Sequence, residues 1–406
     1  MIELKGKNGT AKVFTDNIDD VTIGQIIGMM NERITENNTV RIMPDTHYGK
    51  GSTIGTTIKL NDEQKNWRVS PNVVGVDVGC GIMMFKLSDK DIDFEKLDKV
   101  INRVIPSGQS VHQKSINGKD TQDSILDNLK LELSSSSQKR ILKSLGTLGS
   151  GNHYIEVAQD DEGFYWLSVH SGSRNLGVQV AKSYQEKANI HTKFMSEDML
   201  QIFILGLKEQ GKEKEIQEKV EKYKKEMTVT NPTLSFLNPI DLSDYLHDMV
   251  LTQQYAVRNR ETMLGLICQG MGFNVIDSFD SIHNYIDLDN GIIRKGATSA
   301  QLGERLVIPL NMRDGSLICE GKGNEDWNYS APHGAGRAMS RTVAKEKIDM
   351  EVYKNQMKDV YTTSVVKSTL DEAPDAYKPA QEIIENIKDT ADVIHKLKPV
   401  YNFKAK

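Results

Sequence analysis

The sequence predicts a mixed α+β fold in a single domain. Short apolar runs that alternate with turn residues fill the first 60 residues and return from 275 to 320, a pattern typical of strands. Apolar residues at helical spacing dominate 177–228, 241–266 and 334–396. No repeat of fixed period and no linker rich in Gly, Ser or Pro divides the 406 residues, so we expect one domain over 1–406.

Local patterns predict the elements of the N-terminal half. Runs of apolar residues bounded by turn residues predict strands at 11–14, 40–43, 56–60, 73–87, 154–157 and 164–170. Helical spacing predicts helices at 17–35, 94–104 and 121–145. Three glycines, at 75, 79 and 81, interrupt the run at 73–87, so we expect its backbone to bend sharply or to approach another group closely.

The long helical stretch in the middle of the chain predicts an insertion at about 190–266. Its segment 208–225 alternates Lys with Glu, which is typical of a solvated helix that projects from the body of a protein. Helices at 334–396 complete the predicted α+β pattern.

The composition limits the classes of protein that fit. The formal net charge is -5, whereas proteins that bind nucleic acid over a broad surface are usually basic, so any nucleic-acid site here must be local. The three cysteines, Cys80, Cys268 and Cys319, have no paired spacing, which argues against a disulfide framework. The N-terminus lacks the apolar core of a signal peptide, and no stretch approaches the roughly 20 apolar residues of a membrane span. We therefore expect a cytoplasmic protein.

Four of the nine histidines lie in loops rich in Gly, Asn or Ser at the ends of predicted strands, namely His153, His170, His283 and His333, and His47 is a fifth candidate. The five segments are MPDTHYGKG with His47, GSGNHYIEV with His153, SVHSGSRNLG with His170, SIHNYI with His283 and SAPHGAGR with His333. The segment GVDVGCG adds Asp77 and Cys80, which are three residues apart. Glycines allow tight turns that bring such side chains close together.

One cysteine, one aspartate and three histidines could hold two adjacent metal ions. A thiolate can bridge two cations, imidazole suits Mn, Zn, Fe or Ni, and the carboxylate favours manganese over a pure zinc site. Paired metals commonly serve phosphoryl and nucleotidyl transfer. Each residue taken alone is also typical of a structural histidine or a buried thiol; the joint pattern favours the metal site. His112, His191, His247 and His395 lie in ordinary contexts and are interpreted as structural.

Five motifs, spread in order over most of the chain, resemble signatures of the RtcB family of RNA ligases: GVDVGCG, LGTLGSGNHYIEV, VHSGSRNLG, RKGATSA and HGAGRAMSR. The resemblance implies an RtcB-like catalytic domain over 1–406, with strands around a central metal and nucleotide site, the helical insertion and C-terminal helices. It also implies an enzyme that joins RNA 3′-phosphate or 2′,3′-cyclic phosphate ends to 5′-hydroxyl ends, in tRNA splicing or RNA repair.

The resemblance further implies two Mn²⁺ ions and GTP as cofactors. Asp77, Cys80 and His153 would hold one ion, and Cys80, His170 and His283 the other. His333 would become covalently linked to GMP. The nucleotide pocket would comprise Asn152, His153, Glu156, His283, Asn284, Pro309, Leu310, Asn311, Met312, Ser316, His333, Gly334, Ala335, Gly336 and Lys404. In it Asn152 would touch phosphate, and Glu156 would select guanine by accepting from its N–H edge.

Basic residues in or near the motifs are candidates for contacts to RNA phosphates. They are Arg174, Arg337 and Arg341, with Lys50 and Arg294 as further candidates, and each also has a structural interpretation as an ordinary charged residue.

In IPLNMRDGS, Arg313 and Asp314 lie next to the expected nucleotide, where many family members have a different sequence. An activator protein helps many relatives, so such a partner is possible for this chain.

Two other functions fit part of the pattern. A dinuclear metal phosphoesterase that hydrolyses cyclic phosphates without a nucleotide would use Asp77, Cys80 and the three histidines but would not need His333. A non-catalytic RNA-binding protein could have kept the fold, although the complete ligand set argues against it.

Overall fold

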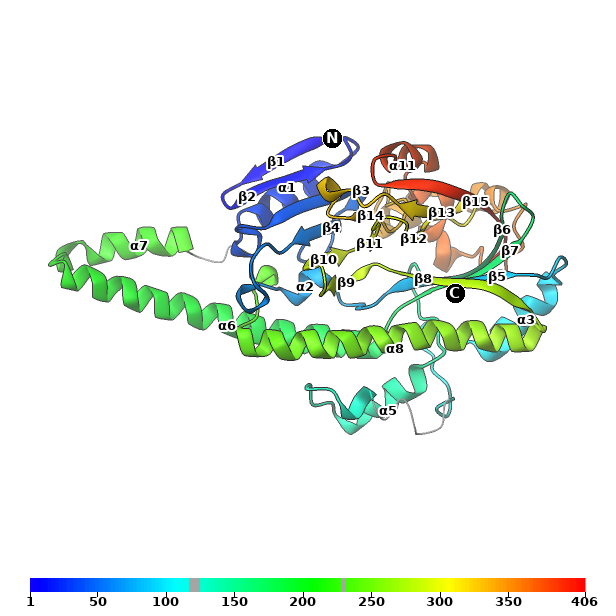
Figure 1. Cartoon of the computed structure of the whole chain (residues 1–406), viewed down its shortest axis with the longest axis horizontal. Helices are drawn as coiled ribbons and strands as arrows, with labels where there is room; N and C mark the ends of the chain where they lie inside the picture. Colours follow the sequence, from blue (N-terminus) through cyan, green and yellow to red (C-terminus); the bar gives the residue numbers. More distant parts are fainter. Residues whose placement is uncertain (117–124, 228–230, 406) are drawn as a thin grey trace.

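The computed structural model of the chain describes residues 1–116, 125–227 and 231–405. Its strands form three sheets, and long helices lie along one side of them (Figure 1). This combination of largely antiparallel sheets and helices confirms the predicted α+β fold class. The assignment of 1–406 to a single domain stays a prediction.

The first sheet has six strands, most of them from the N-terminal part of the chain. In spatial order they are β1 (Ile2–Gly6), β2 (Gly9–Val13), β3 (Thr39–His47), β4 (Ile54–Lys59), β10 (Ile292–Lys295) and β9 (Asn284–Asp287). Neighbouring strands are antiparallel, except for the parallel pair β2 and β3. A short second sheet pairs β11 (Ala297–Ser299) with β14 (Ser330–Pro332).

The third sheet has seven antiparallel strands and contributes to the wall of the cavity described below. In spatial order they are β12 (Arg305–Asn311), β13 (Gly315–Gly321), β15 (Ala391–Phe403), β6 (Tyr154–Gln159), β7 (Tyr165–Ser171), β5 (Gly81–Leu87) and β8 (Val275–Ile282). The sheet curves so strongly that its two edge strands approach each other, with the amide N of Val307 in β12 3.5 Å from Oγ of Ser281 in β8.

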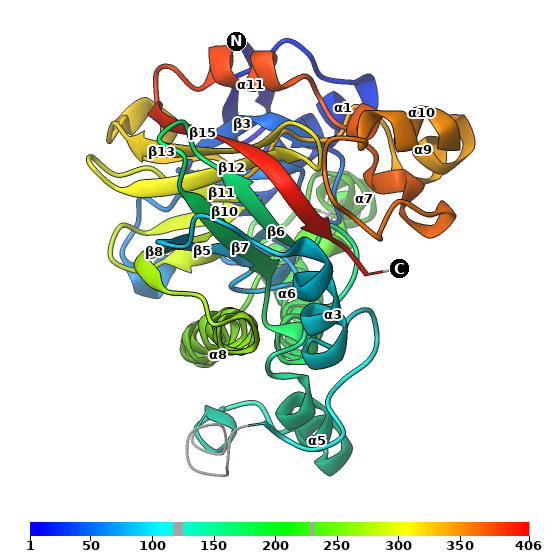
Figure 2. The ribbon, with the colours of Figure 1, turned by 90° about the vertical axis from the view of Figure 1, so that its right-hand side faces the viewer.

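The helices of the described ranges differ widely in length. They are α1 (Asp20–Met30), α2 (Pro71–Val74), α3 (Phe94–Val104), α5 (Ser135–Ser144), α6 (Arg174–Glu209), α7 (Ile216–Met227), α8 (Pro239–Met271), α9 (Arg341–Lys347), α10 (Met350–Gln356) and α11 (Ala380–Asn386). None of them combines the length and the apolar character needed to cross a bilayer. In the end-on view of Figure 2, α8 and α6 run below the sheets.

Alternate residues of the seven-stranded sheet point to two different environments. One set packs with apolar residues of α3 and α8 in a buried cluster, and its members on the central strands are Ile155, Val157, Leu167, Val169, Tyr401 and Phe403. The intervening residues face the other way, and there Glu156 lies opposite Ser168 on one neighbouring strand and Asn402 on the other. Because side chains alternate along a strand, the same strands that build the core present polar groups to the opposite face.

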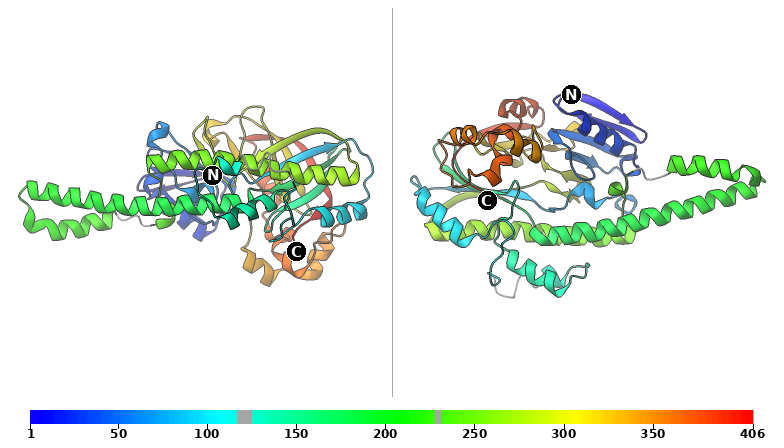
Figure 3. Two further views of the ribbon diagram at one scale, coloured as in Figure 1. Left: turned by 90° about the horizontal axis from the view of Figure 1, so that it is seen from below. Right: turned by 180° about the vertical axis from the view of Figure 1, so that it is seen from behind.

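The far part of α6, together with α7, forms an arm that extends away from the sheets (Figures 1 and 3). This placement confirms the expectation that the segment rich in Lys and Glu projects from the body. The helices around it begin at Arg174 and end at Met271, outside the predicted bounds of about 190–266. The insertion itself stays a prediction, because only the helices are observed.

The end of the chain differs from the prediction of helices over 334–396. Short helices do occur there, but residues from Ala391 onward form β15, in the middle of the seven-stranded sheet. The burial of Val393, Leu397 and their neighbours alternates along β15, as in a strand. Pro399, which cannot donate a backbone hydrogen bond, lies at an irregularity in the pairing of β15 with β6, so the strand tolerates it.

Two other segments also differ from their prediction. The run at 73–87 is not one strand, because α2 ends at Val74 and β5 begins at Gly81, with a glycine-rich loop between them. The helix expected over 121–145 is observed only as α5, and residues 121–124 lie outside the described ranges.

Two adjacent polar residues of α8 fix the loops beneath the sheet. Asn259 is fully buried; its Oδ1 accepts from the amides of Gly146 and Thr147, and its Nδ2 donates to the carbonyls of Thr147 and Gly172. Arg260 is also fully buried, and its Nη1 donates to the carbonyls of Gly79 and Ser171 while the rest of the guanidinium pairs with Asp280. Irregular loops have few backbone partners of their own, so these side chains supply the hydrogen bonds that burial requires.

Replacing Asn259 by Ala should destabilise the fold, since it leaves several buried backbone groups unpaired. We expect the free energy of unfolding to fall by about 3 kcal/mol, in line with the cost of unsatisfied buried groups. Chemical denaturation followed by circular dichroism measures the change. The matched control is Gln254→Ala, at an exposed position of the same helix. Equal stabilities of the two variants would contradict the structural role given to Asn259.

Candidate active site

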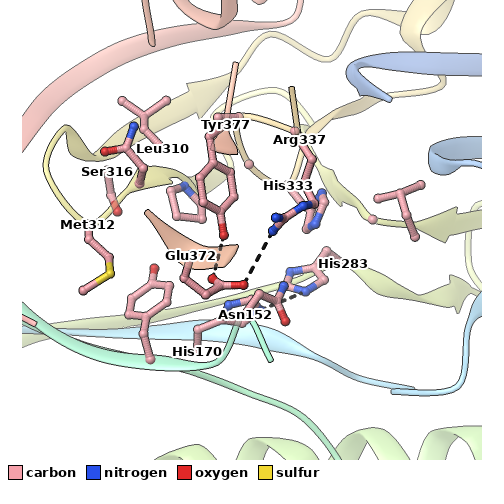
Figure 4. A pocket seen from close by; sticks show the side chains of 18 of the residues that line it. Asn152, His170, His283, Leu310, Met312, Ser316, His333, Arg337, Glu372 and Tyr377 are labelled. Carbon is pink, nitrogen blue, oxygen red and sulfur yellow. Dashed lines mark hydrogen bonds and ion pairs between the residues drawn. The ribbon is translucent and has the colours of Figure 1, made fainter. Parts of the chain in front are cut away.

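Loops and strands from different parts of the chain converge on one cavity, with a volume of about 280 Å³ (Figure 4). Every residue predicted for the metal and nucleotide sites lines it, except His153, which is buried next to Cys80. The predicted residues that do line it are Asp77, Cys80, Asn152, Glu156, His170, His283, Asn284, Pro309, Leu310, Asn311, Met312, Ser316, His333, Gly334, Ala335, Gly336 and Lys404. Their individual roles stay predictions.

Cys80 lies at the centre of a group of metal-ligating atoms. Its Sγ is 3.5 Å from Nε2 of His153 and 3.4 Å from Nε2 of His170. The Nε2 atoms of His170 and His283 are 3.2 Å apart, and Nε2 of His153 is 3.1 Å from Oδ2 of Asp77. Ligand atoms thus form two sets that share Cys80, one with His170 and His283 and one with Asp77 and His153, and within each set they lie within 4.8 Å of one another.

The chemistry of these atoms fits cations. The Nδ1 of His153 donates to the carbonyl of Leu148 at 2.8 Å, which leaves Nε2 facing the thiol and the carboxylate. Burial and neighbouring charged groups lower the pKa of His170 and His283 well below the usual range, so these two rings are neutral and can present lone pairs. Lone pairs crowded at this distance repel one another unless a cation binds them. Mixed N, S and O donors suit transition metals better than Mg²⁺ or Ca²⁺.

The surroundings of Cys80 and Asp77 support the same interpretation. Burial and the nearby Asp77 carboxylate raise the pKa of the Cys80 thiol well above its usual range, so the thiolate needs a cation beside it. The amide of Ser173, at the N-terminus of α6, donates to Oδ1 of Asp77 at 3.1 Å. A Cβ atom at Gly172 would overlap the Asp77 carboxylate, so glycine permits this close approach.

His333 lies beside the proposed metal ligands, with its ring centroid 4.8 Å from that of His283. Its Nδ1 is 2.7 Å from Oδ2 of Asp45, whose side chain is fully buried. Because a carboxylate only accepts, Nδ1 carries the proton, so Nε2 is the nitrogen that bears the lone pair in the neutral tautomer. Gly336 has a φ of 75° and lies so close to the backbone of Asp45 that a Cβ atom would overlap it. Gly336 therefore allows this pairing.

Asp45 was not identified from the sequence. The available signal was its position in MPDTH, two residues before the loop histidine His47. His47 itself lines the cavity, and burial lowers its pKa to about 4, so its ring is neutral. It is not part of either set of clustered ligand atoms.

Polar residues of the seven-stranded sheet form another wall of the cavity. Burial raises the pKa of Glu156 to about 7, although a hydrogen bond from Asn402 and the charge of Lys404 act in the opposite direction. The Nδ2 of Asn402 donates to Oε2 of Glu156 at 2.9 Å. Lys404 is also buried, and its Nζ lies 3.4 Å from the carbonyl of Asn152. Glu156 and Lys404 thus bring an acceptor and a donor to the same region of the cavity.

The carboxylate of Glu372 interacts with several basic residues of the cavity at once. It accepts from Lys404 at 2.7 Å, from Arg341 at 2.6 Å and from the hydroxyl of Tyr377 at 2.6 Å. Arg337 and Tyr377 converge on it in Figure 4. Burial would raise the pKa of Glu372, but Lys404 and Arg341 outweigh this effect and lower it to about 2. Neither Glu372 nor Tyr377 was predicted, because nothing in DEAPDAYK distinguishes them from surface residues.

The basic residues predicted to contact RNA phosphates have different environments. Arg337 and Arg341 line the cavity, although Arg341 also pairs with Asp371 at 2.6 Å. Arg174 lies partly buried against the loop of His153, where it donates to Thr147 and to the carbonyl of Gly108. Lys50 is exposed.

Arg294 is not available for RNA. Its side chain is fully buried, and it donates to Asp287 at 3.0 Å, to Ser330 and to Tyr285. The expectation of a phosphate contact is wrong for this residue, because its guanidinium is used inside the protein.

The family model and the individual relatives described here are all RtcB proteins. A family model described as tRNA-splicing ligase RtcB matches residues 30–405. The chain is 29% identical to the RNA-splicing ligase RtcB of Escherichia coli strain K12, over 89% of this chain and 88% of that protein. It is 24% identical to the tRNA-splicing ligase RtcB of Aeropyrum pernix, over 85% of this chain and 83% of the relative. The RNA-splicing ligase RtcB homolog 1 of Entamoeba histolytica is also 24% identical, over 88% of this chain and 79% of the relative.

Removal of the Cys80 thiol should abolish binding of divalent cations, because both sets of ligands share this atom. We expect Cys80→Ala to lose bound Mn²⁺, as measured by elemental analysis after reconstitution and gel filtration, while its far-UV circular dichroism stays near normal. Cys268→Ala, which removes a half-buried thiol outside both sets, is the control and should retain metal. Full metal content in the Cys80 variant would remove this residue from the site.

Proposed function

The chain belongs to the RtcB family, whose model matches residues 30–405, and we propose that it is an RNA ligase that uses GTP and manganese. It would join RNA 3′-phosphate or 2′,3′-cyclic phosphate ends to 5′-hydroxyl ends. The observation that carries the proposal is the position of His333, whose Nδ1 is paired with Asp45 and which borders the shared cavity next to the clustered metal ligands.

The donor set supports two manganese ions. Asp77, Cys80 and His153 would hold one, and Cys80, His170 and His283 the other. When bound, such ions offset the negative charge that develops on phosphate oxygens during nucleotidyl transfer. The chain's own residues, His333 and Asp45, supply and orient the reacting group.

His333 is the proposed nucleophile. Its Nε2 attacks the α-phosphorus of GTP, so that the N–P bond forms while the bond between the α-phosphorus and the bridging oxygen breaks and pyrophosphate leaves. Asp45 accepts the hydrogen bond from Nδ1 and thereby fixes both the tautomer and the orientation of the ring. The positive charge that the ring gains on bonding to phosphorus is stabilised by the same carboxylate.

Two further transfers would complete ligation. The RNA 3′-phosphate attacks the phosphorus on His333 and takes the guanylyl group, which restores the neutral imidazole. The RNA 5′-hydroxyl then attacks the activated 3′-phosphate and GMP leaves. A 2′,3′-cyclic phosphate would first be hydrolysed to a 3′-phosphate. Arg337 and Arg341, which line the cavity, are the basic residues best placed for RNA phosphates, with Arg174 and Lys50 as further candidates.

The wall of the cavity that contains Glu156 and Lys404 suits a guanine base. Glu156 would accept from the N1–H and the 2-amino group, and Lys404 would donate to O6. Asn152 would contact phosphate. The remaining predicted pocket residues, from Pro309 to Ser316 and from Gly334 to Gly336, surround the same space. A role in tRNA splicing or in RNA repair, an activator protein and a cytoplasmic location stay predictions.

The decisive experiment is the mass of the protein after incubation with GTP and Mn²⁺. We expect the intact chain to gain the mass of one GMP, stable to denaturation, and His333→Ala to gain nothing because it lacks the nucleophile. Intact mass spectrometry measures both. An unmodified wild-type chain that nevertheless hydrolyses cyclic phosphates would favour the dinuclear phosphoesterase instead, and one that does neither while still binding RNA would favour the non-catalytic function.

Asp45 has a separate, testable effect on this step. Asp45→Asn keeps the size of the side chain but can present an N–H to His333 and stabilise the wrong tautomer. By analogy with other carboxylate–histidine pairs, we expect guanylylation to slow by roughly 100-fold or more. Rapid-quench assays with labelled GTP measure the rate, and the manganese content should not change because Asp45 is in neither ligand set. A variant as fast as the wild-type chain would show that the pairing is not needed.

A further inference from the structure

Asn402 is a buried residue that lines the cavity, and the oxygen of its side-chain amide makes no hydrogen bond among the described residues. Only 1% of it is exposed, and it lies directly opposite Glu156 across β15 and β6. Its Nδ2 donates to Oε2 of Glu156 at 2.9 Å. Its Oδ1 is buried but has no hydrogen-bond partner among the described residues. A buried acceptor without a partner is costly, so this atom is suited to a donor supplied by a ligand.

The hydrogen bond to Glu156 determines which polar atom of the Asn402 side chain remains available to a ligand. Since a carboxylate accepts but does not donate, the amide must direct its N–H group toward Glu156, and the carbonyl oxygen remains for the ligand. Asn402 and Glu156 line the same cavity as His333, so both lie where the proposed nucleotide would bind. Two neighbouring strands thus offer adjacent acceptors, the carboxylate of Glu156 and the amide oxygen of Asn402.

A base that fits this wall must carry several adjacent N–H donors. Guanine has three in a row, one on N1 and two on the 2-amino group, whereas adenine places the unprotonated N1 there. Hypoxanthine keeps N1–H and O6 but has no 2-amino group. The carboxylate of Glu156 can accept two of the guanine protons, which leaves one proton of the 2-amino group for a further acceptor.

We propose that Asn402 recognises guanine, with Oδ1 accepting from the 2-amino group while Nδ2 orients the Glu156 carboxylate. This inference rests on the proposed use of GTP and adds a specificity-determining residue to that site. Lys404 directly follows Phe403, the last residue of β15, and its buried side chain lines the same cavity, where it brings a donor close to the acceptors. The end of β15 and the residue that follows it therefore contribute an acceptor and a donor to the edge of the base.

The experiment compares equilibrium binding of GMP and IMP, which differ only in the 2-amino group, by isothermal titration calorimetry in the presence of Mn²⁺. We expect the wild-type chain to bind GMP about 10-fold more tightly than IMP, the effect of one well-placed hydrogen bond in a buried site. Asn402→Ala should weaken GMP binding to nearly the level of IMP and change IMP binding much less. Tyr401→Phe is the control, because Tyr401 belongs to the buried cluster on the other side of β15, and should keep the wild-type ratio.

Several outcomes would overturn the inference. Equal weakening of both nucleotides in Asn402→Ala would mean that the residue only orients Glu156, and equal binding of GMP and IMP by the wild-type chain would rule out recognition of the 2-amino group. Asn402→Leu keeps most of the side-chain volume and serves as the second variant if Ala disturbs folding, which thermal melting would reveal. Failure of the wild-type chain to bind either nucleotide or to become guanylylated would instead contradict the proposed use of GTP.

Discussion

The hydrogen bonds from two buried side chains of α8 hold the candidate site together. Asn259 and Arg260 bind the backbone of three separate loops, which precede His153, follow His170 and lead into Cys80. These loops are irregular, so their peptide groups would be buried without partners if the helix did not supply them. The distances between the ligand atoms thus depend on a helix that contributes no ligand and belongs to none of the sequence motifs.

The alternation of side chains along β6, β7 and β15 links the packing of the apolar core to the placement of the residues that line the cavity. Residues of one parity pack with α3 and α8. Residues of the other parity either line the cavity, as Glu156, His170 and Asn402 do, or pack in a second apolar cluster with residues of β12 and β13. A shift of one residue in the pairing of β15 would exchange the two sets and bring apolar rings into the site. The apolar packing that stabilises the sheet therefore also fixes the register of its polar face, so that Glu156, Asn402 and Lys404 remain together.

The sequence was most informative where local pattern and chemistry coincide. Glycines beside histidines identified loops that do meet at one cavity, and helical spacing identified α6 and α8. Asp45 and Glu372 were missed because they are two among 56 acidic residues, and only the folded chain shows that each is buried against a partner. Arg294 was predicted to contact RNA phosphate because it lies in the motif RKGATSA. Its actual hydrogen-bond partners belong to β9 and to residues 329–330, which are distant from that motif in the sequence or outside it. The final strand was missed because its pairing partners lie far away in the sequence.

The position of β15 has a consequence for synthesis on the ribosome. Its neighbours in the sheet are β13, at 315–321, and β6, at 154–159, so part of its pairing spans more than 230 residues of chain. Until residue 391 and those after it have emerged, β6 and β13 each expose an unpaired edge in the nascent polypeptide. Contacts of such long range form slowly. The nascent chain thus passes through a period in which its exposed edges invite intermolecular pairing, and chaperones that shield strand edges would act during that period.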